Sequence, residues 1–256
     1  MAEDWPKVWV IIATYRRTET ALRTIESVHQ YLKYPNLHWH VADDGSGKAD
    51  DGTDRWHVGV LTDAIAEFYP EVTWHEMDTP PGQFNFGGSV NKAIRAAQAE
   101  GCNLYLLNAD DFVQTRELDL RPMVDVLDQH PSVGLIRLSY WVPWLYSMTQ
   151  VYKAPRLNGA PYIWHRILRW HVDGWPRDSY LLSMQPYVAH TRFHDAYGWA
   201  PEHCTPGNVE TGLGGQYNNS PLGEDGPQIL VPIGETPVEG HYVHLVGRAH
   251  YYAKSG

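Results

Sequence analysis

Pairs of carboxylates follow two apolar stretches of the sequence. Asp43 and Asp44 come directly after one stretch, and Asp110 and Asp111 come shortly after another. Paired carboxylates at the end of a strand can hold a divalent cation, which in turn neutralises phosphate groups. Asp110 and Asp111 are the candidates for the cation, whereas a carboxylate of Asp43 or Asp44 can accept hydrogen bonds from a nucleobase N–H or a ribose hydroxyl. The alternative for Asp110 and Asp111 is an exposed turn that caps the following segment. The alternative for Asp43 and Asp44 is a turn without a ligand, since Asp-Gly is favourable turn chemistry.

A general base and a further metal ligand also have candidates. Glu210 lies in a stretch rich in glycine and proline, where it could be a general base on a loop or a surface acid that caps a helix. His241, His244 and His250 cluster near the C-terminus. One of them could complete a metal site begun by the carboxylates, or each could be a surface or hydrogen-bonded core histidine. Their spacing is not that of a zinc protease.

Alternating strand and helix patterns in residues 1–140 are expected to position these groups. We expect strands at 8–13, 37–42, 72–75, 103–107 and 133–138, and helices at 18–32, 63–68, 89–99 and 123–129, with Thr18 capping the first helix. Such alternation favours an α/β fold with a mostly parallel, helix-covered sheet. Ligands of these sheets bind outside the carboxyl ends of the strands, so turns 14–16, 43–44 and 110–111 are predicted to line one crevice.

Residues 141–256 differ from residues 1–140 in composition. They are rich in Trp, Tyr, His, Pro and Gly and contain only short periodic stretches. No low-complexity linker separates the two halves, so we expect two packed lobes of one compact unit. Trp164 and Trp170 lie in the most aromatic segment and could stack on sugar rings or on another flat acceptor.

Composition excludes several classes of protein. The chain has 256 residues and a formal net charge of −10, which disfavours nonspecific nucleic-acid binding. Neither a dinucleotide-binding G-x-G-x-x-G after the first strand nor a P-loop is present. The N-terminus lacks a signal-peptide pattern, and the longest apolar run, 8–13, is too short to span a bilayer. With two cysteines only, a soluble protein of the cytoplasm is expected.

The order of the motifs resembles that of family-2-type glycosyltransferases, which have the GT-A fold and use nucleotide sugars. The matching segments are Thr14-Tyr15-Arg16, Asp43-Asp44-Gly45-Ser46, 85–93, Asn108-Ala109-Asp110-Asp111, 192–198 and 209–213. Two positions depart from the family pattern. Asn108 stands at the first Asp of the Asp-x-Asp motif, and Val209-Glu210 stands at a Glu-Asp pair. Residues 140–185 have no counterpart and would be an insertion on the acceptor side.

The resemblance implies roles for the matching residues. Those assigned to the nucleotide-sugar donor are Ala13, Thr14, Tyr15 and Arg16 under the nucleotide, Asp43 on the base with Asp44 beside it, Asn91 and Asn108. Asp110 would bind the Mn²⁺ or Mg²⁺ that bridges the diphosphate, with His244 as a further ligand. Glu210 would be the general base. Whether Asp111, His241 or His250 join the metal site is left open.

The predicted activity is transfer of a hexose from a UDP- or dTDP-linked sugar to an acceptor hydroxyl, with inversion and with a metal. The acceptor could be a glycan, a protein, a lipid or a modified nucleobase. Asn108 and Val209-Glu210 motivate one alternative, a non-catalytic glycan- or nucleotide-binding protein with a degenerate site. A nucleotidyltransferase is a second alternative, although Thr14 to Arg17 match its phosphate loop poorly.

Overall fold

Continuous apolar runs form the middle of the sheet. In the computed structural model, every residue of β1 (Val8–Thr14) is buried, and β3 (Leu37–Asp43) and β5 (Leu104–Ala109) pair with it in parallel, one on each side. Strands buried on both faces need such apolar runs, because helices cover each face. The structure describes residues 5–46, 58–80, 83–138, 162–165, 184–222, 225–232 and 241–245.

The other described elements follow in chain order. The strands are β2 (Leu32–Lys33), β4 (Val72–Glu76), β6 (Phe112–Gln114), β7 (Leu118–Asp119), β8 (Val133–Arg137), β9 (Tyr162–His165), β10 (Tyr187–His190), β11 (Gln228–Pro232) and β12 (Tyr242–His244). The helices are α1 (Thr18–Tyr31), α2 (Val58–Phe68), α3 (Phe86–Ala99), α4 (Arg121–Gln129), α5 (Arg192–Tyr197) and α6 (Pro206–Asn218).

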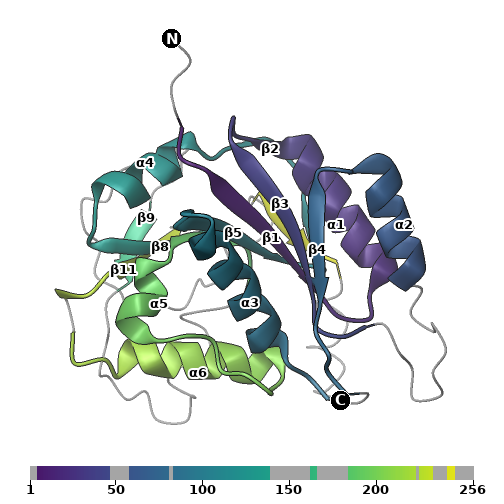
Figure 1. The fold of residues 1–256 in the computed structure, drawn as a ribbon. Helices are drawn as coiled ribbons and strands as arrows, with labels where there is room; N and C mark the ends of the chain where they lie inside the picture. The colour runs from purple at the N-terminus through teal and green to yellow at the C-terminus, as the bar shows by residue number, and fades with distance from the viewer. Residues whose placement is uncertain are drawn as a thin grey trace, which may run out of the picture.

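One mixed sheet runs through both halves of the sequence (Figure 1). Its strand order is β4-β3-β1-β5-β10-β8-β11-β9. β10 runs antiparallel to both of its neighbours, β5 and β8, and therefore inserts a strand of the second half between two strands of the first. Two small sheets, β12-β6 and β2-β7, lie outside the main one.

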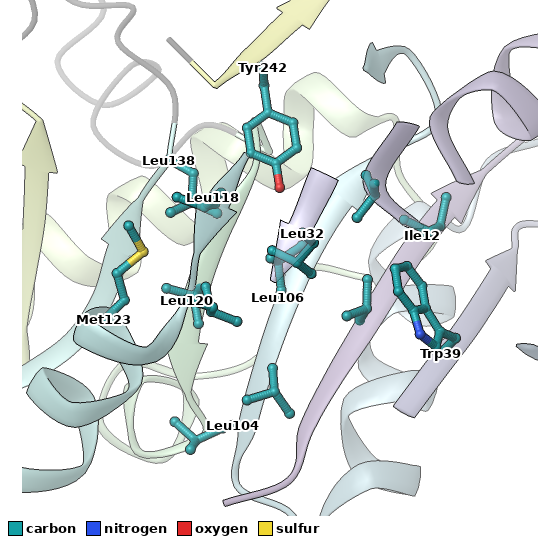
Figure 2. Close-up of a cluster of buried hydrophobic side chains, with 14 of the residues drawn as sticks. Ile12, Leu32, Trp39, Leu104, Leu106, Leu118, Leu120, Met123, Leu138 and Tyr242 are labelled. Atoms are coloured by element: carbon teal, nitrogen blue, oxygen red, sulfur yellow. The ribbon is translucent and has the colours of Figure 1, made fainter. Parts of the chain in front are cut away.

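Alternate residues of β1 point to two separate cores. Val8, Val10 and Ile12 pack in the cluster with α1, α2 and α4, while Trp9 and Ile11 pack in the cluster with α3, α5 and α6. Figure 2 shows the first cluster, where Tyr242 of β12 joins Leu106 and Leu118. Full burial of one such aliphatic side chain is worth about 1.5–3 kcal/mol. The two cores therefore fix the sheet rigidly from both faces.

Several helix boundaries differ from those expected. Arg17, and not Thr18, is the N-cap of α1, because the Arg17 carbonyl accepts the Ala21 N–H at 2.8 Å. Leu32 lies outside α1 and pairs in β2 with Leu118. α2 begins at Val58 and not at residue 63, and α3 begins at Phe86 and not at residue 89. Hydrophobic periodicity marks these helices only from residues 63 and 89, because the first turn of each contains glycine.

The register of the sheet brings the predicted turns to one edge. Thr14 lies opposite Asp43, and Ala13 lies opposite Ala109. β1, β3 and β5 therefore end at the same level, and the segments that follow them are neighbours at the carboxyl edge of the sheet.

Candidate functional site

Backbone hydrogen bonds continue past the ends of β1, β3 and β5. The Asp110 N–H donates to the Ala13 carbonyl at 2.9 Å, and the Asp44 N–H donates to the Thr14 carbonyl at 3.0 Å. These bonds fix both acidic turns against the end of β1. The sequence-predicted residues Ala13, Thr14, Asp43 and Asp110 are thus brought together.

Asp43 is a buried carboxylate with one oxygen left without a partner. Its Oδ1 accepts hydrogen bonds from the N–H (2.9 Å) and the Oγ (2.6 Å) of Ser46, while its Oδ2 is buried and has no hydrogen-bond partner. Burial raises the pKa of Asp43 to about 6, although the bonds from Ser46 oppose that shift. A buried acceptor without a donor is costly, so a ligand N–H or O–H at Oδ2 would bind favourably.

Arg16 holds Ser46 in place from the neighbouring strand end. Its N–H donates to the Ser46 Oγ at 2.7 Å, and its backbone has a φ of 56°, in the left-handed region. The Arg16 guanidinium lies over the Tyr15 ring, 4.8 Å from its centroid. The Tyr15 hydroxyl donates to the Gln83 carbonyl at 3.2 Å, so Tyr15 and Arg16 tie the site to the segment before α3.

Asp44 is engaged by the protein itself. Its carboxylate accepts the Asn85 N–H at 2.8 Å and the Thr79 hydroxyl at 3.1 Å. Burial raises its pKa, and these two bonds oppose the shift. Gly45, with a φ of +85°, permits the tight turn, since a Cβ there would lie 2.9 Å from the Met77 carbonyl oxygen. Asp44 therefore closes the loop beside Asp43.

Asp110 accepts hydrogen bonds from the residues that end β1. Its Oδ2 accepts the Thr14 hydroxyl at 2.9 Å and the Tyr15 N–H at 3.2 Å. Burial first, and then the neighbouring Asp111, raise the pKa of Asp110 to about 7, against the pull of Arg17. Because of its nearly complete burial, Asp110 changes between its charged and neutral forms close to neutral pH.

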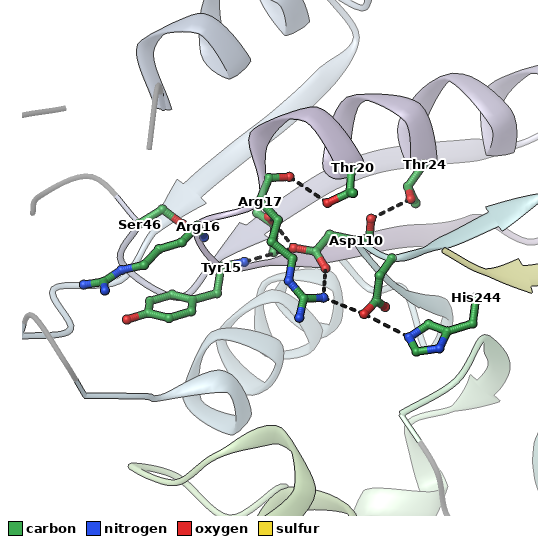
Figure 3. A network of polar contacts seen from close by, with 10 residues as sticks. Tyr15, Arg16, Arg17, Thr20, Thr24, Ser46, Asp110 and His244 are labelled. Atoms are coloured by element: carbon green, nitrogen blue, oxygen red, sulfur yellow. Dashed lines mark hydrogen bonds and ion pairs between the residues drawn. The ribbon is translucent and has the colours of Figure 1, made fainter. Parts of the chain in front are cut away.

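Arg17 links the two adjacent carboxylates (Figure 3). One guanidinium nitrogen, Nη1, lies 3.4 Å from Asp110 Oδ1 and in close contact with Asp111 Oδ2. The same Asp111 oxygen lies 3.1 Å from His244 Nε2. Burial opposes ionisation of Asp111, but His244 and Arg17 outweigh it and lower the pKa. Asp111 is therefore held as the anion of this network.

His244 reaches the site through strand pairing. β12 pairs antiparallel with β6, which sets His244 opposite Phe112, and the two rings stack with centroids 4.6 Å apart. The Leu245 N–H donates to the Asp111 carbonyl at 2.8 Å. His241 acts differently: its carbonyl accepts the Thr115 N–H, and burial lowers its pKa to about 4.

The two asparagines implied by the family resemblance bond within the chain. Asn108 is fully buried, and its Nδ2 donates to the Phe112 carbonyl at 2.9 Å, a bond that an aspartate could not make. Asn91, also fully buried, donates to the Ala200 carbonyl and to Glu202 and accepts the Ala200 N–H. These contacts use both N–H donors and the oxygen of Asn91, and a contact between Asn91 and the donor stays a prediction.

Glu210 lies in α6, where the first turn is capped by Thr205. Its Oε1 accepts the Met184 N–H at 2.7 Å. Fully buried Arg137, at the end of β8, donates to Gln185 at 2.9 Å. Burial lowers the pKa of Arg137 to about 10, and the charge of Glu210 opposes that shift. Glu210 is thus held at the segment that begins at residue 184, and its approach to an acceptor stays a prediction.

The remaining sequence candidates are only partly described. Trp164 lies in β9, paired with Leu230 of β11. Trp170 and His250 lie outside the described residues.

The chemistry of Asp110, Asp111 and His244 suits a divalent cation, since carboxylate and imidazole are usual ligands of Mn²⁺. Within the described ranges, however, no three His, Cys, Asp or Glu side chains are grouped as a metal site requires. The side chain that faces both carboxylates is Arg17.

Arg17 and Ser46 are the site residues that sequence reasoning did not select. Both lie close to residues that it did select, Arg17 directly after Arg16 and Ser46 two residues after Asp44. The sequence signal for Arg17 is an arginine at the predicted start of a helix, shortly after a buried strand. Only the register of β1 and β5 shows that Arg17 meets the Asp110-Asp111 turn.

Comparisons with known proteins identify a family. The family described as "Glycosyl transferase family 2" matches residues 9–177. No curated protein matches the chain. Within the described residues, no helix has the length and apolar character that crossing a membrane requires.

Solved structures of similar fold include two of S. aureus TarS 1–349. One has 16% identity and a TM-score of 0.53, and the other, in complex with UDP, has 16% and 0.54. A third is the mannosyltransferase PcManGT from Pyrobaculum calidifontis in complex with GDP-Man and Mn²⁺, with 15% and 0.55. They cover 92–93% of this chain, which spans 59% of the length of each. At such identities the likeness shows the fold, and it confirms the α/β architecture predicted from the alternation of strands and helices.

Proposed function

The chain belongs to glycosyl transferase family 2, and on this premise we propose that it transfers a hexose from a UDP- or dTDP-linked sugar to an acceptor hydroxyl. The observation that carries the proposal is the buried, unpartnered Oδ2 of Asp43. It lies at the same carboxyl edge of the sheet as Asp110, with β1 between β3 and β5. A uracil or thymine ring presents one N–H, which suits a single free carboxylate oxygen.

A divalent cation is part of the proposal. Asp110 and Asp111, with His244, would hold Mn²⁺ or Mg²⁺, which supplies charge neutralisation for the departing nucleoside diphosphate. PcManGT, whose fold is similar, is in complex with Mn²⁺. The Thr14 hydroxyl and the Tyr15 N–H keep Asp110 oriented.

Glu210 is the proposed general base. It would take the proton of the acceptor hydroxyl while that oxygen bonds to the anomeric carbon and the bond from the anomeric carbon to the diphosphate oxygen breaks. Attack opposite the leaving group inverts the anomeric centre. Trp164 and Trp170 remain proposed contacts of the acceptor, because aromatic faces suit sugar rings.

Nucleotide binding and donor turnover test the proposal together. UDP, dTDP, GDP and ADP would be screened by thermal shift with Mn²⁺, since a ligand of the native state raises the melting temperature. The stabilising nucleotide defines the donors, whose cleavage is followed by release of the nucleoside diphosphate. We expect UDP or dTDP to stabilise the protein, and the matching sugar donor to be cleaved.

The result also separates the alternatives. Binding of a nucleotide without cleavage of any matching donor, with or without candidate acceptors, would favour the non-catalytic binding protein. Release of pyrophosphate from a nucleoside triphosphate and a sugar phosphate would instead identify a nucleotidyltransferase. No binding of any nucleoside diphosphate would overturn the proposal.

A further inference from the structure

We propose that Arg17 is a built-in counter-ion of the Asp110-Asp111 pair that competes with the divalent cation, so that the metal binds strongly only together with the donor's diphosphate. The inference rests on the proposed metal site and adds a residue that controls how strongly this site binds the divalent cation. Arg17 acts here on the metal ligands and is a positioning residue.

The geometry places one nitrogen where a bridging ion would have to sit. Arg17 Nη1 contacts Asp110 Oδ1 and Asp111 Oδ2 together (Figure 3). A Mn²⁺ or Mg²⁺ ion bound by both oxygens would need distances of about 2.0–2.6 Å from each. A guanidinium that faces the same two oxygens excludes such an ion, so Arg17 must move before both carboxylates can bind one.

The surroundings of the pair make this competition strong. The side chains of Asp110 and Asp111 are 7% and 12% exposed, so water and salt screen their charges poorly. Two adjacent buried carboxylates without a cation would repel each other. Arg17 supplies one positive charge to this pair.

Arg17 is free to leave on the solvent side. Its side chain is 45% exposed, while its backbone caps α1 through the bond from Ala21 to its carbonyl. A side-chain rotation therefore need not disturb the helix. A donor diphosphate at the carboxyl edge brings negative charge that can bind both the metal and the displaced guanidinium.

Binding of Mn²⁺ by the intact protein tests the proposal without any turnover. Free Mn²⁺ would be measured by electron paramagnetic resonance, with and without UDP, in the wild type and in Arg17→Gln, Arg17→Met and Arg17→Lys. The matched control is Arg23→Gln, which removes the same charge from an exposed position of α1. Melting temperatures would establish that each variant is folded.

We expect Arg17→Gln and Arg17→Met to bind Mn²⁺ roughly tenfold or more tightly than the wild type without UDP, because a contacting positive charge is gone. Arg17→Lys keeps the charge and should stay close to the wild type, as should Arg23→Gln. The gain in Mn²⁺ affinity that UDP gives the wild type should shrink in the two neutral variants.

Two results would overturn the inference. One is that both neutral variants bind Mn²⁺ as strongly as the wild type or more weakly. Arg17 would then orient the metal ligands and would not compete with the metal. The other is absence of Mn²⁺ binding from every variant with UDP present. In either case, donor cleavage by the wild type would leave the transferase proposal standing, while a wild type that binds no nucleotide would refute the transferase proposal separately.

Discussion

Asp43 and Ser46 form an acceptor that only a hydrogen-bond donor can satisfy. The two hydrogen bonds from Ser46 occupy Oδ1, which leaves Oδ2 to a ligand. In Asp43→Asn, the amide oxygen can keep the bonds from Ser46, but the NH₂ group then faces the ligand's N–H. We expect nucleoside diphosphate affinity to fall by about 1.5–3 kcal/mol, measured by calorimetry.

The control for this change is Asp63→Asn, on the exposed side of α2. It should leave nucleotide affinity unchanged. Unchanged affinity in Asp43→Asn as well would remove the nucleobase contact from the assignment.

Glu210 carries the other residue-scale prediction. Glu210→Gln keeps the shape of the side chain, and its amide oxygen can still accept the Met184 N–H. A base, however, needs the ionised carboxylate, so turnover should fall by about 10²–10⁴ with donor binding nearly intact. The assay is release of nucleoside diphosphate under single-turnover conditions.

Asp225→Asn is the comparison for Glu210, since Asp225 is a nearby acid outside α6. Loss of turnover in that variant, with normal turnover in Glu210→Gln, would show that the base had been assigned to the wrong motif.

Residue types and order were sufficient to predict Asp43 and Asp110 at one edge of the sheet, because each follows a recognisable apolar strand. Residue types and order could not predict that Asp44 and Asn91 make hydrogen bonds within the protein. Those contacts join residues 41 and 109 positions apart, and no local pattern encodes such pairs. The same reason hid the contact between Arg17 and Asp111.

At the scale of elements, α3 and α6 approach each other around Pro201. A Cβ on Gly87 would lie 1.9 Å from the Pro201 carbonyl oxygen, and one on Gly212 would lie 2.3 Å from the Pro201 ring. Small residues are therefore required where both helices meet this segment. Asn91 fixes the same segment through Ala200 and Glu202.

Gly87→Ala should destabilise the protein by about 1–3 kcal/mol, since the methyl group must push backbone atoms aside. Urea denaturation measures the change. Gly207→Ala is the matched control, because nothing lies within 4 Å of its Cβ and it stands in the first turn of α6. Equal free energies of unfolding for the two variants would show that the Pro201 segment moves aside without destabilising the protein.

Strand positions were largely predictable, whereas helix starts and the strands of the second half were not. Buried strands carry continuous apolar runs that mark them directly. β9 and β12 are four and three residues long and exist through pairing with β11 and β6. Their existence depends on paired residues 64 or more positions away along the chain, which a local pattern cannot show.

For the whole molecule, a group of fully or partly buried histidines is expected to make stability depend on pH. Burial lowers the pKa of His40 to about 3 and that of His75, His190, His194 and His241 to about 4. His40 and His75 also face each other, with ring nitrogens 2.6 Å apart. Charging both would place like charges in contact, so the native state keeps them neutral.

The direction of the pH dependence follows from proton uptake. Between about pH 6.5 and pH 4.5, the unfolded chain protonates these histidines and the native protein does not, so acidification lowers the free energy of unfolding. Asp43 and Asp110 act oppositely, because their raised pKa values, about 6 and about 7, let the native state bind protons first. Burial also raises the pKa of Asp44 and lowers that of His38, so six histidines act against three carboxylates. The histidine effect is therefore dominant.

We therefore expect the urea midpoint to fall steadily from pH 7 to pH 5, with a loss on the order of a few kcal/mol, at about 1.4 kcal/mol per proton and pH unit. His40→Gln removes one of the buried histidines and should reduce the slope, whereas His130→Gln, at an exposed position, should not. A midpoint that rose on acidification would show that the raised carboxylates, and not the buried histidines, control the balance.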